Sequence, residues 1–452
     1  MFADFIDNSG GVNCSDHEVN LKILLGLAEA RGELTRPERD ELLRAVTPDV
    51  VEHVRYGSFL QAQILAEEVA VSRGRMYAYE DLMTALEAEG LLDRALEALP
   101  GAEEMAERRR ADRGMERPEL AVLLAYAKRS LARGLLAGGF CDDPWLERDL
   151  AAYFPAAVVA RFGHLLADHP LRRELVATIN ANHVLDSLGP TFVSQLAAER
   201  GAEPAEVVRA FRVAREVTGA VARWDAVERL PRTVDPATAT ELMEGVDRLV
   251  EAATRWYVGH DRAHDLEAAI ARAEAPFARL VAVLPDIGAE AWQERRRRVV
   301  GALTADGVPD DVAWAHALTP ELQQATDIIA IAEDTGRPVE SVTAAVHDLG
   351  ARLEIVWLLA ALDHLPQPTR TQRWAVQAVR EDCLEALAAL ARAALESAGP
   401  AAPPDAAVDA YLATRETLVR RLAHVTHSLT VEGTGDLPGL MLAVRALRAL
   451  AG

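Results

Sequence analysis

The residues best suited to chemistry lie near the start of the chain, where an apolar stretch leads into a polar turn. The turn runs from Asp7 to Gly11, and Gly10 and Gly11 permit positive φ and let a ligand approach the backbone without a Cβ in the way. Ser15 and Glu18 have the spacing of a capping box, which predicts a helix beginning just after the turn. The free N–H groups and positive dipole end of such a helix favour an anion. We therefore expect a strand, a turn and a capped helix with an anion site.

Three further patterns have the letters of a site, but each has a plainer reading. The run Ser15-Asp16-His17 resembles a hydrolase triad, yet consecutive helical residues point in different directions and cannot form a relay. His260 and His264 share a helix face, but no third protein ligand for a metal is evident. Residues 169–183, HPLRRELVATINANH, interrupt an apolar pattern with polar residues. Such a stretch indicates a buried hydrogen-bonded network or, less often, a ligand site.

Phosphate-binding loops are the conspicuous absence from this sequence. No G-x-G-x-x-G follows an expected strand, and no G-x-x-x-x-G-K-[ST] occurs anywhere. We therefore do not expect this chain alone to hold a nucleotide.

Charge and composition limit the partners and the compartment. The chain has 452 residues and a formal net charge of −22, which disfavours nucleic acid and anionic membranes because both need a positive surface. The longest strongly apolar run, Leu120–Ala127, is far below the roughly 20 residues that cross a bilayer. Cys14, Cys141 and Cys383 are widely spaced and give neither a disulfide framework nor a metal pair. These features fit a cytoplasmic protein.

The chain is expected to fold as a mainly all-α, multi-helix protein. Helix-forming residues dominate, and aromatic residues make up only 5%. The segment Glu119–Leu136 is apolar almost all round, which is typical of a helix at the centre of a domain. Helix starts are predicted where a capping oxygen precedes a proline, as at Thr35–Glu38, Thr47–Asp49, Asp143–Pro144 and Thr319–Glu321.

The opening motif also resembles the end of the catalytic domain in the large NAD-dependent glutamate dehydrogenases of bacteria. The resemblance extends over essentially the whole chain, since further motifs are similar to successive landmarks of that family's C-terminal helical region. The motifs are IDNSGGVNCSDHEVNLKI, RPELAVLLAYAK, DDPWL with YFP, HPLRRELVATINAN, ATRWYV, VHDLGARLEIVWLL, RWAVQAVREDCLEAL and LMLAVRALRAL. The resemblance implies a helical C-terminal portion preceded by the last strand-turn-helix of a Rossmann-type domain.

The resemblance also implies roles for residues of the opening motif. Smaller glutamate dehydrogenases carry a related N-A-G-G-V-x-x-S signature, which matches here from Asn8 to Ser15 with Ser9 in place of alanine. By this match Asn8, Gly10 and Gly11 would lie by the NAD cofactor, and Ser15 would bind the glutamate γ-carboxylate. A hydroxyl at a helix N-terminus suits a carboxylate, but it could instead cap its own helix.

Two hypotheses for function follow. In the first, the chain is the C-terminal part of an NAD-dependent glutamate dehydrogenase, which converts L-glutamate to 2-oxoglutarate and ammonia. The family's dinucleotide loop and catalytic lysine have no match here, so no catalytic residue is assigned and the chain alone is expected to be inactive. Its partners would be the upstream dehydrogenase domain and further copies in a homo-oligomer. In the second hypothesis, the chain is a stand-alone helical interaction or scaffold protein.

The first hypothesis implies a division of the chain into three parts. Residues 1–31 would be the remnant of the catalytic domain, residues 32–115 a helical connector, and residues 116–452 the C-terminal helical domain. A stretch rich in proline and alanine, residues 397–407, would be an exposed linker within that domain.

Overall fold

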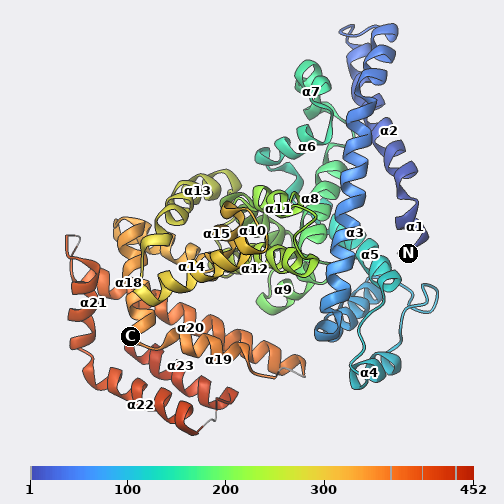
Figure 1. The fold of residues 1–452 in the computed structure, drawn as a ribbon. Helices are drawn as coiled ribbons and strands as arrows, with labels where there is room; N and C mark the ends of the chain where they lie inside the picture. The colour runs from blue at the N-terminus through green and yellow to red at the C-terminus, as the bar shows by residue number, and fades with distance from the viewer. Residues whose placement is uncertain (1–2, 367–368, 400, 433–434, 452) are drawn as a thin grey trace. The chain divides into compact units, whose positions relative to one another are not determined.

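Helices account for the regular structure of this protein. The computed structural model describes residues 3–366, 369–399, 401–432 and 435–451, and within these ranges there are helices but no strand (Figure 1). The expectation of a mainly all-α fold is confirmed. Two compact units divide the chain: the first comprises Met1–Val213 and Tyr257–Glu267, and the second comprises Ala214–Trp256 and Ala268–Gly452. No described helix combines the length and the apolar character needed to span a membrane.

The helices are numbered in chain order, from α1 near the start to α23 near the end. The first ten are α1 Asp4–Asp7, α2 Ser9–Ala30, α3 Arg36–Ala88, α4 Ala102–Arg110, α5 Arg117–Ala137, α6 Glu147–Tyr153, α7 Ala156–Phe162, α8 Arg172–Leu188, α9 Phe192–Arg200 and α10 Pro204–Val217. The next are α11 Ala220–Glu228, α12 Pro236–His260, α13 Leu266–Val283, α14 Glu290–Ala305, α15 Asp310–Ala317, α16 Thr319–Leu322, α17 Ala325–Thr335 and α18 Val339–Arg352. The last are α19 Ile355–Asp363, α20 Arg370–Ser397, α21 Pro404–Ala413, α22 Glu416–Glu432 and α23 Leu437–Ala451.

The predicted strand and turn at the start of the chain are wrong. Residues Asp4–Asp7 form a short helix, and α2 begins at Ser9, so Gly10 and Gly11 lie inside the first turn of a helix. A lone strand leaves its backbone N–H and C=O groups without partners, and the described part of the chain holds no other strand for it to pair with. A helix satisfies those groups locally, which explains why this segment is helical here.

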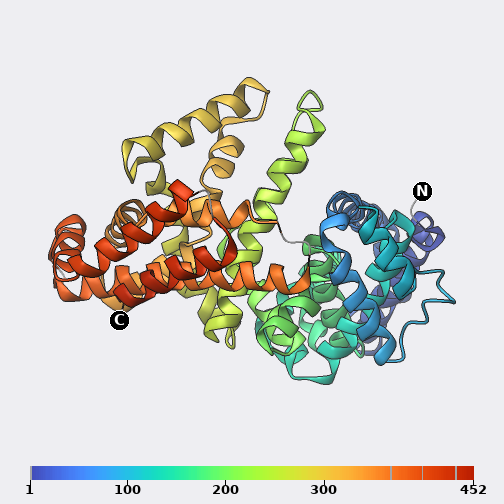
Figure 2. The same cartoon turned by 90° about the horizontal axis from the view of Figure 1, so that it is seen from below.

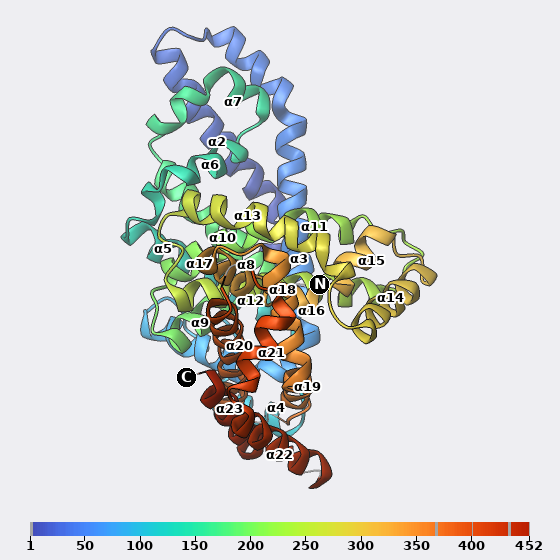
Figure 3. The same cartoon turned by 90° about the vertical axis from the view of Figure 1, so that its left-hand side faces the viewer.

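The long helix α3 begins where the sequence predicts and continues where it does not. Thr35 and Glu38 form a capping box, in which the Thr35 N–H donates to Glu38 Oε2 at 2.8 Å. The predicted second start at Thr47–Pro48 is wrong, because Pro48 lies inside α3 and Thr47 Oγ1 donates back to the Leu43 carbonyl at 2.9 Å. A proline removes one backbone hydrogen bond, and packing along the rest of α3 outweighs that loss. In Figures 1 and 3, α2 runs beside α3 with α7 next to them.

The first unit is built around α5, the helix predicted to be central. Pro118 lies in its first turn, and the N–H of Glu116 donates to Glu119 Oε2 at 2.7 Å, so the helix start is fixed by a capping box. The buried apolar residues cover most of its circumference, and α5 packs against both α3 and α8. They are Leu120, Ala121, Val122, Leu123, Leu124, Ala127, Leu131 and Leu135. The prediction of a central apolar helix is confirmed.

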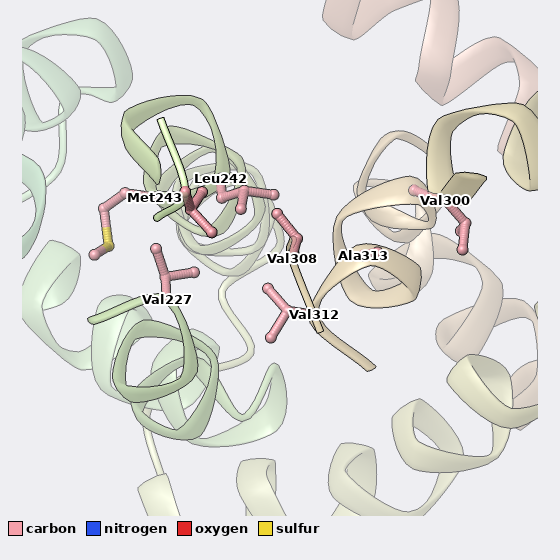
Figure 4. Close-up of a cluster of buried hydrophobic side chains, with 9 residues drawn as sticks. Val227, Leu242, Met243, Val300, Val308, Val312 and Ala313 are labelled. Carbon is pink, nitrogen blue, oxygen red and sulfur yellow. The ribbon is translucent and has the colours of Figure 1, made fainter. Parts of the chain in front are cut away.

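The second unit has two recognisable cores. In one, α20 lies beside α23, as the orange and red helices of Figure 2 show, and α18 and α21 pack against α20 as well. In the other, α11, α12, α14 and α15 enclose a cluster of buried aliphatic side chains (Figure 4). This cluster comprises Val227, Val234, Leu242, Met243, Val300, Val308, Val312, Ala313 and Ala317.

The connection between α20 and α21 is tied down by one arginine. Arg337 is 5% exposed, and its guanidinium donates to the carbonyls of Leu395 at 3.1 Å, Ala402 at 2.8 Å and Gly399. The last carbonyls of a helix lack partners within the helix, so these contacts satisfy groups that would otherwise need water. Residues 404–407 of the predicted linker lie in the first turn of α21, and Ala407 is fully buried.

Candidate functional site

The predicted site residues lie together at the junction of α1 and α2. Asn8 separates the two helices, is exposed, and its Nδ2 donates to Asp4 Oδ2 at 3.4 Å. Gly10 and Gly11 follow in the first turn of α2, and apart from the adjacent backbone of this helix no atom lies within 4 Å of a Cβ built on either. The N–H groups of this first turn have no partners within the helix, so the anion-favouring end of α2 lies at Ser9 to Gly11.

The predicted capping box of Ser15 and Glu18 is wrong. Ser15 is exposed in the second turn of α2, where its own N–H belongs to the helix interior. The Glu18 carboxylate forms an ion pair with Lys22 one turn further on rather than with the backbone near Ser15. The N-cap of α2 is Asn8, seven residues before Ser15, so Ser15 does not cap this helix. Its hydroxyl projects from the surface of this helix.

The side of α2 that faces the protein carries a cluster centred on Tyr153, the last residue of α6. The Tyr153 hydroxyl donates to Asp16 Oδ2 at 2.8 Å and accepts from Asn20 Nδ2 at 3.2 Å. The His17 ring stacks on Tyr153, with ring centroids 4.3 Å apart and planes 15° apart. Burial and the neighbouring Asp16 carboxylate both raise the pKa of Tyr153. Tyr153 therefore stays protonated and anchors α2 as a hydrogen-bond donor.

Asp16 and His17 consequently contact Tyr153 rather than forming a triad with Ser15. Burial and the nearby His53 ring both lower the pKa of His17, which keeps this imidazole neutral. Asn20 is 2% exposed and also donates to the Asp16 carbonyl at 3.0 Å. The helix carrying the predicted site residues is thus held on one face by a defined polar cluster, and its other face is left open.

Asn180 and His183 of the polar stretch 169–183 take part in a buried hydrogen-bonded network, as predicted. Asn180 is fully buried, and its Nδ2 donates to Asp149 Oδ2 at 3.1 Å. Arg212 of α10 is 1% exposed, donates from Nη2 to Asp149 Oδ1 at 2.8 Å, and donates from Nη1 to His183 Nδ1 at 2.8 Å. Because a guanidinium can only donate, His183 Nδ1 carries no proton. The Arg212 guanidinium also lies 5.0 Å from the ring centroid of Trp145.

This network joins two of the sequence motifs and one helix that lies outside them. Asp149 follows the DDPWL motif, Asn180 and His183 lie on α8, and Arg212 comes from α10. Asp143 of the same motif forms an ion pair with Arg209 at 2.6 Å. Oppositely charged groups are paired in a buried position, so their evident role is to fix three helices relative to one another. Sequence reasoning missed Arg212 and Tyr153. The signal for Arg212 was a charged residue on the apolar stripe that includes Val208 and Phe211.

The exposed His264 and the buried thiols of Cys141 and Cys383 have plain structural surroundings. His264 Nε2 lies 2.8 Å from Asp261 Oδ1, and no group of three His, Cys, Asp or Glu residues is placed to hold a metal within that part. Burial raises the pKa of the Cys141 thiol to about 11 and that of Cys383 to about 12. A thiol of that kind is almost wholly protonated at neutral pH and reacts slowly.

Comparison with known proteins gives consistent matches along the chain. A family model described as "Glutamate dehydrogenase, C-terminal" matches residues 112–449. A second, described as "Bacterial NAD-glutamate dehydrogenase, catalytic domain", matches residues 1–68.

Three curated relatives are each named NAD-specific glutamate dehydrogenase. The protein of Halomonas elongata is 34% identical over 457 residues, covering 99% of this chain and 28% of the relative. That of Pseudomonas aeruginosa is 37% identical over 387 residues, covering 84% of this chain and 24% of the relative. That of Mycobacterium tuberculosis is 29% identical over 451 residues, covering 99% of this chain and 28% of the relative. The chain therefore spans less than a third of the length of these relatives.

Proposed function

Since this chain belongs to the bacterial NAD-dependent glutamate dehydrogenase family, we propose that it works as the C-terminal part of such an enzyme. The proposed reaction is the oxidative deamination of L-glutamate to 2-oxoglutarate and ammonia with NAD. The observation that carries the proposal is the order of the matches, with a catalytic-domain model at residues 1–68 and a C-terminal model at residues 112–449. The long helical region would serve in assembly or regulation.

Within the complete enzyme, we propose that the junction of α1 and α2 forms one wall of the active site. Asn8, Gly10 and Gly11 would lie by the cofactor, and Ser15 would hydrogen-bond the γ-carboxylate of glutamate. The residues fit these roles in two respects: Asn8 and Ser15 are exposed, and the glycines leave open space beside the first turn of α2. NAD, when bound, supplies the hydride acceptor. This chain would contribute binding and orientation, and we assign it no residue that moves a proton.

We further propose that the chain by itself does not turn over glutamate. Its sequence has no dinucleotide loop, and the described residues contain no strand on which such a loop could be mounted. The purified chain mixed with glutamate and NAD should give no NADH absorbance at 340 nm. Measurable turnover would overturn this part of the proposal.

A chimeric enzyme tests the main proposal directly. The region of the Halomonas elongata relative that aligns with this chain would be replaced by this chain, and glutamate-dependent NADH formation would be measured. We expect the chimera to be active and the same relative lacking that region to be inactive. A chimera that folds but shows no activity would contradict the proposal and favour the alternative of a helical interaction protein.

The division of labour along the chain is also proposed. Residues 1–31 would belong to the catalytic domain, residues 32–115 would connect it to the helical domain, and residues 116–452 would form that domain with a linker at 397–407. The start of the C-terminal match at residue 112 supports the second boundary.

The finer partners and the compartment are proposals as well. The chain would contact the upstream dehydrogenase domain and pair with further copies in a homo-oligomer. Large apolar side chains such as Trp374, 46% exposed, and Met441, 51% exposed, are available for such contacts. A cytoplasmic location is supported by the three cysteines, each a free thiol.

A further inference from the structure

A large pocket with apolar walls lies within the second unit. Its volume is about 510 Å³, and its walls come mainly from α11, α12, α13 and α15. Val227, Leu242 and Val312 approach one another from three of these helices in Figure 4, and Phe277 adds an aromatic wall from α13. A pocket of this volume and lining is typical of sites for small organic ligands.

The pocket contains one cation that its surroundings do not neutralise. Arg223 of α11 lines the pocket, is half-buried, and its Nε donates to the Thr218 carbonyl at 2.9 Å. Within the described ranges, Arg223 forms no ion pair with a carboxylate. Burial therefore lowers the pKa of this guanidinium, and no neighbouring charge offsets that effect. Burying a charge without a counterion costs free energy, which a bound anion would recover.

The other titratable groups of the pocket do not fill this role. Glu274 and Asp311 line it but are exposed, so water solvates their charges. Glu216 accepts from Arg215 Nη1 at 2.9 Å. Burial lowers the pKa of His316, which keeps its ring neutral. The guanidinium of Arg223 is thus the charged group of the pocket that lacks a counterion.

We propose that this pocket binds a small monocarboxylate with an aliphatic or aromatic body. The carboxylate accepts hydrogen bonds from Arg223, whose planar guanidinium can bind both oxygens. The apolar body packs against the sides of Val227, Leu242, Val312 and Phe277 that line the pocket. All residues that line this pocket belong to the second unit, and the junction of α1 and α2 belongs to the first.

The test is a titration of the full chain with 4-phenylbutanoate, measured by isothermal titration calorimetry. We expect saturable binding of one molecule per chain. The Arg223→Met variant should bind at least tenfold more weakly, because it loses a charge-assisted hydrogen bond. The matched control is Arg229→Met, whose side chain is 79% exposed and paired with Asp225. This control should bind like the wild type, and Arg223→Lys should recover part of the affinity.

Ligand analogues and a blocking variant make the test independent of one substitution. The alcohol 4-phenylbutan-1-ol and the amine 4-phenylbutylamine have the same body, and each should bind at least tenfold more weakly than the acid. If Arg223→Met does not fold, Ala315→Phe, which fills the pocket from α15, should abolish binding while circular dichroism stays unchanged. The proposal is overturned if the wild type shows no saturable binding, if Arg223→Met binds as tightly, or if the amine binds as well as the acid.

Discussion

Two arginines on consecutive helices of this protein meet opposite surroundings. Arg212 of α10 is 1% exposed and donates to the Asp149 carboxylate and to the ring of His183. Arg223 of α11 is half-buried, donates from Nε to a single backbone carbonyl, and forms no ion pair in the described part of the chain. Both are guanidinium groups taken at least partly out of water. One has its counterion supplied by the fold, and the other does not.

The contrast separates structural charges from charges that are open to a ligand. A buried cation with a carboxylate partner already has its electrostatic complement, so a ligand could gain little by displacing that partner. A half-buried cation that lies beside an apolar pocket and has no counterion in the protein would be stabilised by a bound anion. Arg296 of the second unit belongs with Arg212, because it is fully buried and its Nε donates to Glu321 Oε1 at 3.2 Å. The burial of a charged side chain therefore does not by itself identify a ligand site. What identifies one is whether a protein group of opposite charge already pairs with that side chain.

The largest expected effect comes from breaking the paired arginine. Arg212→Met should lower the free energy of unfolding of the first unit by about 3–5 kcal/mol, because the buried Asp149 carboxylate loses its guanidinium. Hydrogen exchange of the α8 amides in a urea series would measure this loss. The double variant Arg212→Met with Asp149→Leu should recover much of it, since an apolar pair leaves no buried charge. A loss below about 1 kcal/mol in the single variant would mean that the Arg212 charge does not stabilise the fold.

The stability of the second unit should depend on pH through His347, which lies near Arg296. Burial, together with the positive charge of Arg296, lowers the pKa of His347 to about 4. Between this value and the ordinary pKa of about 6.5, the unfolded chain binds a proton that the folded chain does not. The contribution of His347 to the free energy of unfolding is therefore fully present above pH 6.5. It is lost as the pH drops toward 4, by about 3 kcal/mol in all.

A substitution isolates this histidine from the other titrating groups. In His347→Gln the difference in unfolding free energy between pH 7 and pH 4.5 should be smaller than in the wild type, as measured by urea unfolding at each pH. His264→Gln is the matched control for replacing a histidine by glutamine, because the His264 side chain is 69% exposed. Equal pH profiles for the His347 variant and the wild type would mean that His347 protonates freely in the folded state.

The unpaired arginine should behave in the opposite way from Arg212. Arg223→Met removes a half-buried charge that has no counterion and costs one hydrogen bond to the Thr218 carbonyl, so the two contributions oppose each other. The free energy of unfolding should change by no more than about 1 kcal/mol, in the same assay applied to the amides of α11. A loss as large as that of Arg212→Met would mean that Arg223 holds the fold together, and the comparison would fail.

The sequence predicted those parts of the molecule that local patterns determine. The all-α fold, the capping box of Thr35 and Glu38, and the central helix α5 follow from propensity, capping and helical periodicity, which act over a few residues. The polar stretch around Asn180 was correctly read as a network, because polar side chains at that density in an apolar helix must find partners. The identity of the partners, Asp149 and Arg212, depends on three helices meeting and could not be read from any one of them.

The errors also have physical causes. The strand before Ser15 was predicted from an apolar stretch and the turn from two glycines, but whether a segment becomes a strand depends on another strand to pair with. The pocket beside Arg223 left no signal in the sequence, because its valines and leucines are spaced like those of any buried helix face. An empty volume is a property of how side chains from several helices fail to close, and no single helix contains that information.

The smallest expected effect concerns Ser15, which has a structural reading and a functional one. If Ser15 capped a helix, Ser15→Ala would cost about 1 kcal/mol; because it lies exposed inside α2, the change should be within about 0.5 kcal/mol and in favour of alanine. Urea unfolding of this chain measures that difference, with Ser9→Ala at the true start of α2 as the comparison. In the chimeric dehydrogenase the same Ser15→Ala change should raise the KM for glutamate without a comparable loss of stability. A serine that matters for substrate and not for folding is a residue whose partner is a ligand, the same distinction that separates Arg223 from Arg212.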